Sequence, residues 1–296
     1  MNNIDTQAEM LDVEERRIVS RSLDAYRKMS PSEKIGTILV VFWLIVAIFG
    51  PMLAPYEVGA FVAEEVFDTA SFTHILGTDY LGRDVLSRVL SGARYTVGLA
   101  LASALTASAI GITIALFSVV SSRIVDEVIS RLMDAFISIP SKILALVIVA
   151  AFGSSIPLLY IVVAITYIPG AFRIARSLAV GQNEMEYVIV ARARGEGRAY
   201  IACVEIFPNI INPMLTDFGL RFIFAILLLS GLSFLGLGVQ PPFADLGSLV
   251  RENMSGLAEG ALAILAPSVA IATLTIGMNL MIDSLPHNNK KHGGEG

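Results

Sequence analysis

The chain has 296 residues, of which 55% are hydrophobic and 16% are charged, with a formal net charge of -5. Its mean hydropathy of +0.71 excludes an ordinary soluble globular protein and indicates a membrane protein. The single cysteine, Cys203, excludes an internal disulfide framework, and three scattered histidines argue against a metal site. Phosphate-binding and hydrolase motifs are missing from the sequence, so we expect no enzymatic activity and no cofactor on this chain.

The N-terminal segment 1–34 is polar and basic, and an apolar run follows it. The basic segment is too long for a signal peptide, and the run at 35–53 is close to the roughly 20 residues that a spanning helix needs. Further apolar runs of sufficient length follow along the chain. We therefore predict an all-α membrane protein with six transmembrane helices, near 35–53, 95–120, 128–152, 156–178, 210–237 and 261–280.

The distribution of Lys and Arg predicts the orientation of these spans. Most of the cations fall in segment 1–34, loop 121–127, loop 179–209 and the tail 286–296, or at their membrane edges. The positive-inside bias places those segments in the cytoplasm, together with both termini, and places loops 54–94, 153–155 and 238–260 outside. We expect a membrane domain over 35–285, in contact with lipid, and no feature of the sequence indicates a nucleic-acid partner.

The two long outer loops contain polar and turn-forming residues that we take as candidates for an external loop or gate. In 74–94, opposite charges lie four residues apart, which predicts a short helix on the outer surface or a contact with an external partner; Thr78 or Asp79 would cap it. In 233–247, Gly and Pro residues end a span. This segment is either a plain helix terminus or the bent rim of an outer gate. The loop that follows, through residue 260, is long enough to contain a re-entrant piece buried in protein. The candidates are Gly77, Thr78, Asp79, Gly82, Arg83, Asp84, Arg88, Gly236, Gly238, Pro241 and Pro242.

Four charged residues fall within the predicted spans, where each is costly and marks a candidate function. Asp217 and Arg221 lie one turn apart and neutralise one another, which favours a structural role over lining a pathway. Asp134 falls near the inner surface, and Lys142 either snorkels or faces a polar cavity. No span has the series of carboxylates expected of a proton relay. Gly98, Gly111 and Gly170 suit close helix packing.

The stretch 184–208 is the one polar interruption in the apolar second half. We predict a helix over 184–194, a turn at 195–197, a second helix over 198–207 and a new segment from Pro208. Its position predicts a cytoplasmic hairpin that contacts another protein. The candidate coupling residues are Glu184, Glu186, Tyr187, Ala191, Arg192, Gly195, Glu205 and Pro208.

Four blocks of sequence carry a resemblance to a known family: LGTDYLGRDVLSRVLSGAR (76–94), RLMDAFISIPS (131–141), EYVIVARARGEG with IFPN (186–209) and SFLGLGVQPPFADLG (233–247). With NLMID (279–283), they occur in the family's order. The chain resembles the inner-membrane permease subunit of binding-protein-dependent ABC importers of the dipeptide and oligopeptide type. The resemblance implies a type I importer fold, in which a cytoplasmic coupling helix docks on a separate ATPase.

That resemblance implies partners and a function for the chain. The partners are a second permease, two ATPase subunits that hold ATP and Mg²⁺, and a periplasmic or tethered substrate-binding protein in a bacterial or archaeal cytoplasmic membrane. The substrate would be a short peptide, or nickel, glutathione, an opine or an oligosaccharide. By resemblance, Glu186, Tyr187, Ala191, Gly195 and Pro208 belong to the coupling element. The family's Glu-Ala-Ala triplet here reads Ile-Val-Ala at 189–191, and its frequent histidine is a glutamate at 205.

Two other classes stay open at this point. One is an ion-coupled secondary transporter, which would work without an ATPase. The other is a membrane scaffold or sensor, which would move no solute. Neither class accounts for both the hairpin and the LGTDYLGRDV block.

Overall fold

The structure is a computed structural model that describes residues 30–282, and its regular elements over this range are helices. The predicted topology of the two chain ends stays a prediction, because those ends lie outside the described residues. The charged and histidine residues concerned are Arg16, Arg17, Arg21, Arg27, Lys28, His287, Lys290, Lys291 and His292.

Five stretches of helix are long and apolar enough to cross a membrane, and a bent pair of helices makes a sixth if it is counted as one span. The five stretches are α2 (Pro31–Leu53), α3 (Val85–Val120), α6 (Ile156–Asn183), Arg198–Phe234, which ends in α9 (Phe207–Phe234), and α11 (Leu262–Ile282). The bent pair is α4 (Arg123–Ile137) and α5 (Ser141–Phe152). The fold is thus the predicted all-helical membrane architecture.

The predicted span 128–152 is not one straight helix. Its two halves, α4 and α5, meet at an angle of 77°. The break falls at residues 138–140, because Pro140 has no N–H to donate and its ring disfavours helical backbone at the residue before it. The composition of the run alone does not predict so large a bend.

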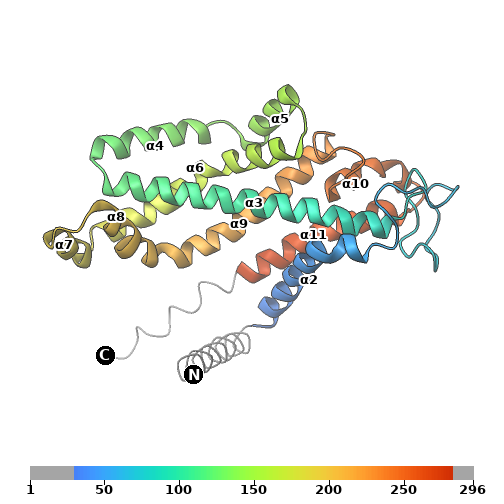
Figure 1. The fold of residues 1–296 in the computed structure, drawn as a ribbon, viewed down its shortest axis with the longest axis horizontal. Coiled ribbons are helices and arrows are strands. Elements are labelled where there is room, and N and C mark those ends of the chain that lie inside the picture. The colour runs from blue at the N-terminus through green and yellow to red at the C-terminus, as the bar shows by residue number, and fades with distance from the viewer. Residues whose placement is uncertain (1–29, 283–296) are drawn as a thin grey trace, which may run out of the picture.

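The helices form an elongated bundle in which α3 runs through the middle (Figure 1). With 36 residues, α3 is about 54 Å long at 1.5 Å per residue, well beyond the ~30 Å of a bilayer core. One end of the bundle, the hairpin end, holds α7 (Glu186–Ala193) and α8 (Arg198–Tyr200). The other, the loop end, holds residues 54–84 and α10 (Leu246–Glu252). The two candidate sites therefore lie at opposite ends of the molecule.

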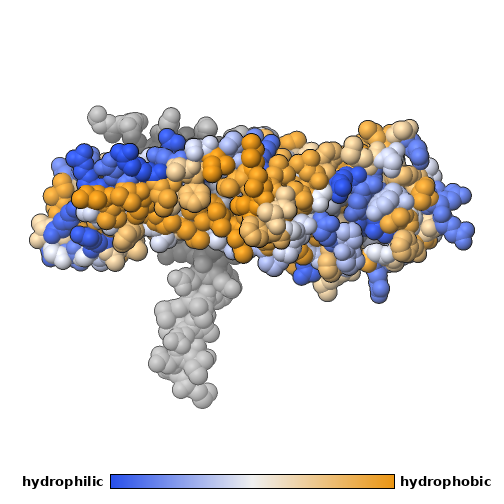
Figure 2. Space-filling view, turned by 90° about the horizontal axis from the view of Figure 1, so that it is seen from above, coloured by the Kyte–Doolittle hydropathy of each residue, from blue (hydrophilic) through white to orange (hydrophobic). Residues whose placement is uncertain are grey.

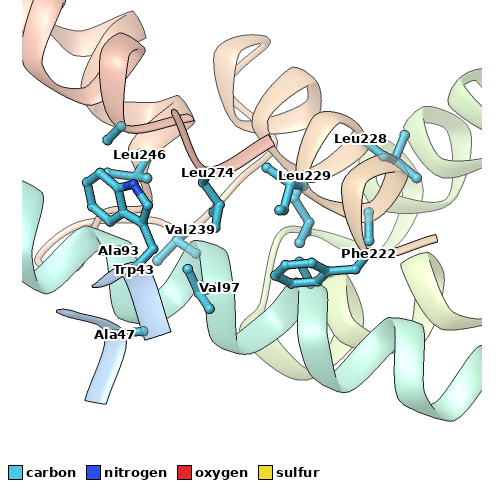
Figure 3. Packing of buried hydrophobic residues seen from close by; sticks show 14 of the residues in the cluster. Trp43, Ala47, Ala93, Val97, Phe222, Leu228, Leu229, Val239, Leu246 and Leu274 are labelled. Atoms are coloured by element: carbon cyan, nitrogen blue, oxygen red, sulfur yellow. The ribbon is translucent and has the colours of Figure 1, made fainter. Parts of the chain in front are cut away.

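The main core takes buried side chains from α2, α3, α5, α6, α9, α10 and α11. Trp43 of α2, Val97 of α3, Phe222 of α9 and Leu274 of α11 are all buried in one cluster (Figure 3). Small residues let the backbones approach closely: a Cβ placed on Gly111 of α3 would overlap the Ala171 side chain of α6. The two helices α3 and α6 are therefore packed closely side by side, and α3 continues to the loop end.

The loop 238–260, which the sequence predicts to lie outside, contains a helix packed within the protein. The carboxylate of Asp245 caps α10 by accepting a hydrogen bond from the Ser248 amide at 3.0 Å. Leu246 and Leu249 of α10 are buried against α3, α9 and α11, and a short 3-10 helix, η2 (Met254–Leu257), follows. The buried α10 shows that this loop is more than a plain helix terminus, and the outer gate stays a prediction.

Candidate coupling hairpin and the loop-end network

The hairpin at residues 184–208 reverses direction at Gly195. This residue has φ +85°, a left-handed conformation that favours glycine. Its N–H donates to the Arg192 carbonyl at 3.0 Å, and the Glu196 N–H donates to the Ala191 carbonyl at 3.2 Å. This pair of bonds is the Schellman arrangement that ends a helix, so α7 stops here for a local reason.

The second arm of the hairpin differs from its prediction. It does not end at Pro208, because α8, a π-helix η1 (Ile201–Ile206) and α9 form one continuous helical stretch from Arg198 to Phe234. The wider i→i+5 turns precede Pro208, which cannot donate a backbone hydrogen bond. The side-chain amide of Asn209 donates a further hydrogen bond to the Glu205 carbonyl at 2.7 Å. The hairpin is therefore directly continuous with a membrane-spanning helix.

One face of the hairpin is packed against the bundle. Val188 and Ala191 of α7 and Ile206 of η1 have no exposed surface, and they share a core with Phe172 of α6 and Leu116 of α3. Burial of such side chains contributes roughly 1.5–3 kcal/mol for each large aliphatic group. The hairpin is thus held stiffly on α3 and α6 and is not a free loop.

Polar contacts tie the hairpin to the end of α6. The Tyr187 hydroxyl donates to the Gln182 side-chain oxygen and accepts from Asn209, while Arg192 donates to the Asn183 side chain at 2.7 Å. Burial, with a further contribution from the Glu205 charge, raises the pKa of the Tyr187 hydroxyl, so it stays a neutral donor.

The remaining candidate coupling residues sit on the outer side of the hairpin. Glu184 and Glu186 are exposed at the junction of α6 and α7, and Glu205 lies 3.5 Å from the Arg194 guanidinium. Beside them, Met185, Ile189 and Val190 expose large apolar surfaces. The hairpin therefore presents an apolar tip with a charged border, and two of these apolar residues replace members of the expected triplet.

At the loop end, a network of buried charges joins segments that lie far apart in the sequence. Asp79 has no exposed surface; its Oδ2 accepts from Arg83 Nε at 2.8 Å and from Arg88 Nη1 at 2.7 Å. Both arginines also donate to Glu252 Oε2 of α10, at 3.0 and 2.8 Å. The Asn253 side-chain oxygen accepts from the Tyr80 amide at 3.2 Å. The network fixes loop 54–84 to α3 and to α10.

The predicted surface helix over 74–94 is wrong in three respects. The helix begins only at Val85, its cap is Asp84, and the four charged residues at its start are buried. The Asp79–Arg83 pair is present, but Asp84 accepts from Ser87 at 2.6 Å and Arg88 pairs with Asp79 instead. Residues 74–84 cannot form a helix because left-handed glycines interrupt them, and these glycines approach the backbone of the same loop.

Gly77 and Gly82 are those glycines, with φ +73° and +70°. A Cβ on Gly77 would overlap the Asp68 carbonyl, and one on Gly82 would overlap the Ala63 carbonyl. Between them, Thr78 accepts a hydrogen bond from the Asp68 amide at 2.8 Å. The LGTDYLG block thus forms a compact turn in which Asp79 is buried.

The rim residues after α9 form a second buried turn. Gly236, with φ +87°, ends α9 with the same Schellman bonding as Gly195 has in α7, and the peptide bond between Pro241 and Pro242 is cis. Gly238 packs directly on Ser233. At the centre, Asp245 Oδ2 accepts from the Ser233 hydroxyl at 2.7 Å and the Val239 amide at 3.0 Å.

The Asp245 carboxyl is almost completely buried. Burial raises its pKa, and the hydrogen bonds from Ser233, the Val239 amide and the Ser248 amide act in the opposite direction. The carboxyl therefore links the rim turn to the cap of α10.

The charged residues in the predicted spans occupy different surroundings. Arg221 forms a two-fold hydrogen bond with Asp217, at 2.6 and 2.9 Å, and donates to the Tyr167 carbonyl at 3.0 Å; both side chains are buried. Asp134 and Lys142 are exposed, on either side of the α4–α5 bend. The charges of Asp217 and Arg221 neutralise each other inside the bundle, whereas Asp134 and Lys142 lie on its surface.

An open cavity of about 240 Å³ lies at the α4–α5 bend, and its lining is mainly apolar. One side is lined by Phe136, Ile137, Ile139, Pro140, Ser141 and Leu144, and the other by Ile165, Thr166, Tyr167, Pro169 and Gly170 of α6. Within residues 30–282, no three His, Cys, Asp or Glu side chains form a group that could hold a metal ion. The cavity therefore presents a mainly apolar surface.

Residues 107–288 match the family described as binding-protein-dependent transport system inner membrane component. The matched region covers well over half of the chain, including the hairpin and the rim turn. The chain belongs to this transport family. It is therefore a non-enzymatic permease component of a transport system in the membrane.

Individual relatives support the same assignment. The chain is 30% identical to the dipeptide transport system permease protein DppC of Escherichia coli over 88% of its length and 89% of the relative. It is 31% identical to the di/tripeptide transport system permease protein DppC of Pseudomonas aeruginosa over 84% of both chains. The dipeptide permease DppC of Alkalihalophilus pseudofirmus is 29% identical over 90% of this chain and 88% of its own length.

Three residues of the loop end were missed by the sequence reasoning. Glu252 and Asn253 complete the Asp79 network, yet they lie more than 160 residues after it in the chain. No spacing rule connects positions so far apart. Asp245 had a detectable signal, because it stands within the SFLGLGVQPPFADLG block, next to the prolines that were selected.

Proposed function

We propose that this chain forms half of the pathway of an ATP-driven importer, paired with a second permease subunit. Two ATPase subunits bind at the hairpin end, and a substrate-binding protein delivers the solute at the loop end. The hairpin end faces the cytoplasm, with both chain termini on that side. The solute is a short peptide, a choice supported by the names of the relatives.

The observation that carries this proposal is the construction of the hairpin. One face is buried on α3 and α6, and its second arm continues without interruption into α9. The opposite face exposes Met185, Ile189 and Val190 within a charged border. Such a stiff element transmits a push at its tip to the spanning helices, whereas a flexible loop would absorb that push. Alternating access through rigid movement of helices requires such a lever.

The charges support the orientation. Arg173 and Arg176 near the end of α6, Arg123 at the start of α4 and the arginines of the hairpin all gather at the hairpin end. The positive-inside bias favours the cytoplasm for this end.

A pair of proline substitutions in the hairpin tests the coupling. Gly195→Pro forces φ from +85° to about -65° and removes the N–H that bonds to Arg192. Gly197→Pro is the matched control, because Gly197 already has φ -74°. We expect Gly195→Pro to abolish ATP-dependent uptake in proteoliposomes containing the full transporter, while Gly197→Pro retains it.

Three measurements on the same preparations decide the outcome. Co-purification of the ATPase reports docking, ATP hydrolysis reports its activity, and peptide uptake reports coupling. Undiminished uptake in Gly195→Pro would contradict the role of the hairpin. Uptake by permease subunits without any ATPase, driven by an ion gradient, would contradict the importer mechanism itself.

A further inference from the structure

The break between α4 and α5 lies deep in the membrane-spanning part of the bundle. Ser141 and Leu144, which follow the break, line the cavity together with Thr166 of α6. Residues 156–172 of α6 contain no charged residue, and Arg173 is the first cation after them. At 1.5 Å per residue, Thr166 lies about 10 Å from Arg173 and about 15 Å from the start of α6. On the side of α4 and α5, the surface is mainly hydrophobic along the middle of the molecule, with hydrophilic patches toward both ends (Figure 2). The break is therefore well inside a bilayer core that is ~30 Å thick.

Irregular backbone at this depth requires a neighbour other than lipid. Residues 138–140 lie outside both helices, and all three are exposed on the surface of the chain. Hydrocarbon offers no partner for backbone polar groups, so a non-helical segment at membrane depth is buried in protein or lines a water-filled space. The described part of the chain leaves the break uncovered, which indicates that a water-filled space or another subunit lies against it.

Lys142 adds an uncompensated charge at the break. Its side chain is exposed and has no hydrogen bond or ion pair within residues 30–282. The nearby Arg221, whose guanidinium packs on Gly170 of the cavity lining, is instead neutralised by Asp217. A charged side chain within a span is costly and marks a solute pathway or a partner of opposite charge. Lys142 therefore calls for an anionic partner that the described chain does not supply.

The periodicity of α5 places Lys142 on the bundle side of the helix. Ala145 and Val149, three and seven residues later, share this face and have no exposed surface. Ile143 and Val147 form a different, apolar face and are 55% and 61% exposed. Lysine can snorkel to a membrane edge, but its four-carbon stem is shorter than the distance from the break to either end of the span. Contact with lipid thus does not account for this lysine.

We infer that the Lys142 ammonium and the neighbouring cavity form a transit site, deep in the membrane, for a solute with a carboxylate and an apolar side chain. The inference rests on the proposed importer function and deepens it, because the C-terminal residue of a short peptide carries both groups. The carboxylate pairs with the ammonium, and the side chain enters the cavity of about 240 Å³, whose lining is mainly apolar. A single hydrated ion pair is weak, so the solute is not trapped on its way through.

Two competing arrangements make different predictions. If a carboxylate of the second permease pairs with Lys142, removal of the ammonium leaves that carboxylate buried and unpaired, which weakens the association of the two subunits. If a lipid acyl chain fills the cavity, the ammonium has no role in uptake. Only a solute site makes the effect of Lys142 depend on the chemistry of the solute.

Uptake by the full transporter tests the site. Lys142→Met removes the charge and approximately keeps the length of the side chain, Lys142→Arg keeps the charge, and Ile143→Met is the matched control on the exposed apolar face. Proteoliposomes with both permeases, the ATPases and the binding protein receive glycyl-leucine or its C-terminal amide, each at a concentration that saturates the binding protein. Uptake is measured per ATP hydrolysed, and co-purification of the second permease is measured on the same preparations.

We expect Lys142→Met to lower the uptake of glycyl-leucine per ATP about fivefold, the effect of losing one exposed ion pair, and to change uptake of the amide less than twofold. Lys142→Arg and Ile143→Met should stay within about twofold of the wild type for both probes. Unchanged uptake of glycyl-leucine by Lys142→Met, or an equal loss for the peptide and its amide, would overturn the inference. Loss of the second permease on purification would overturn it too, in favour of a pair between subunits. The requirement of the wild-type transporter for ATP tests the proposed function separately.

Discussion

Replacement of Asp79 by alanine should destabilise the loop end strongly. The wild-type carboxylate is fully buried and accepts hydrogen bonds from the backbone amides of Leu81 and Arg83 at 2.9 Å each. It also accepts the charged bonds from Arg83 and Arg88. In the variant, both guanidiniums would share only Glu252, inside a region with little access to water. The protein would retain two buried positive charges, those of Arg83 and Arg88, with only one of the two carboxylates that now neutralise them.

The expected cost follows from that loss. Removing one partner of a buried ion pair costs about 3–5 kcal/mol, because the remaining charge stays buried and uncompensated. For a chain of this size, we expect a fall in Tm on the order of 10 °C. Asp79→Asn keeps the shape and one acceptor oxygen, so its cost should be smaller.

Thermal unfolding of the purified transporter in nanodiscs measures the effect. Glu64→Ala, at an exposed acidic residue of the same loop, is the control and should leave Tm within about 1 °C. The free energy of unfolding lost in a double variant with Glu252→Gln should differ from the sum of the losses in the two single variants, because both acids contact the same arginines. An Asp79→Ala Tm equal to that of the control would refute the view that this network holds the loop end together.

Two further substitutions test packing and capping. Gly111→Ala should destabilise the α3–α6 contact by about 2 kcal/mol, since its Cβ would lie 2.8 Å from the Phe172 amide nitrogen. Gly98→Ala in the same helix meets open space, so its Tm should be equal to or slightly above that of the wild type, because alanine favours the helix. Equal Tm values for the two would contradict the close approach. Asp245→Ala should cost ~3 kcal/mol by removing the cap of α10 and the acceptor of the rim turn, and should speed amide hydrogen exchange at Val239. Unchanged exchange there would argue against this role.

Local signals in the sequence account for much of the fold. Long apolar runs predict spanning helices because each such helix satisfies its own backbone hydrogen bonds in lipid. Gly195 predicts the hairpin turn because glycine readily adopts the left-handed conformation that commonly ends a helix. The blocks around 76–94 and 186–209 supplied the family, which the comparisons confirm. The site residues of the hairpin stay predictions that the proposed variants test.

Local reasoning failed where distant segments compete with near neighbours. Asp84 and Arg88 have the spacing of a helical pair, but Arg88 gains more by bonding with Asp79 and Glu252 in the buried network. Pro208 has the character of a helix start, yet the π-helical turns before it let the helix continue. In both cases the local rule was sound, and a larger interaction outweighed it.

Hydropathy and charge along the chain thus determined that this protein is a helical membrane protein with a polar hairpin between two spans, and the resemblance of its sequence blocks indicated a permease. Only the tertiary structure decided that the hairpin is packed on α3 and α6, that α10 holds loop 54–84 through Glu252, and that α4 and α5 meet at a sharp bend near Pro140. The physical reason is the range of the interactions. Backbone bonding and burial in lipid act within a helix, while ion pairs and packing join residues that the fold alone brings together.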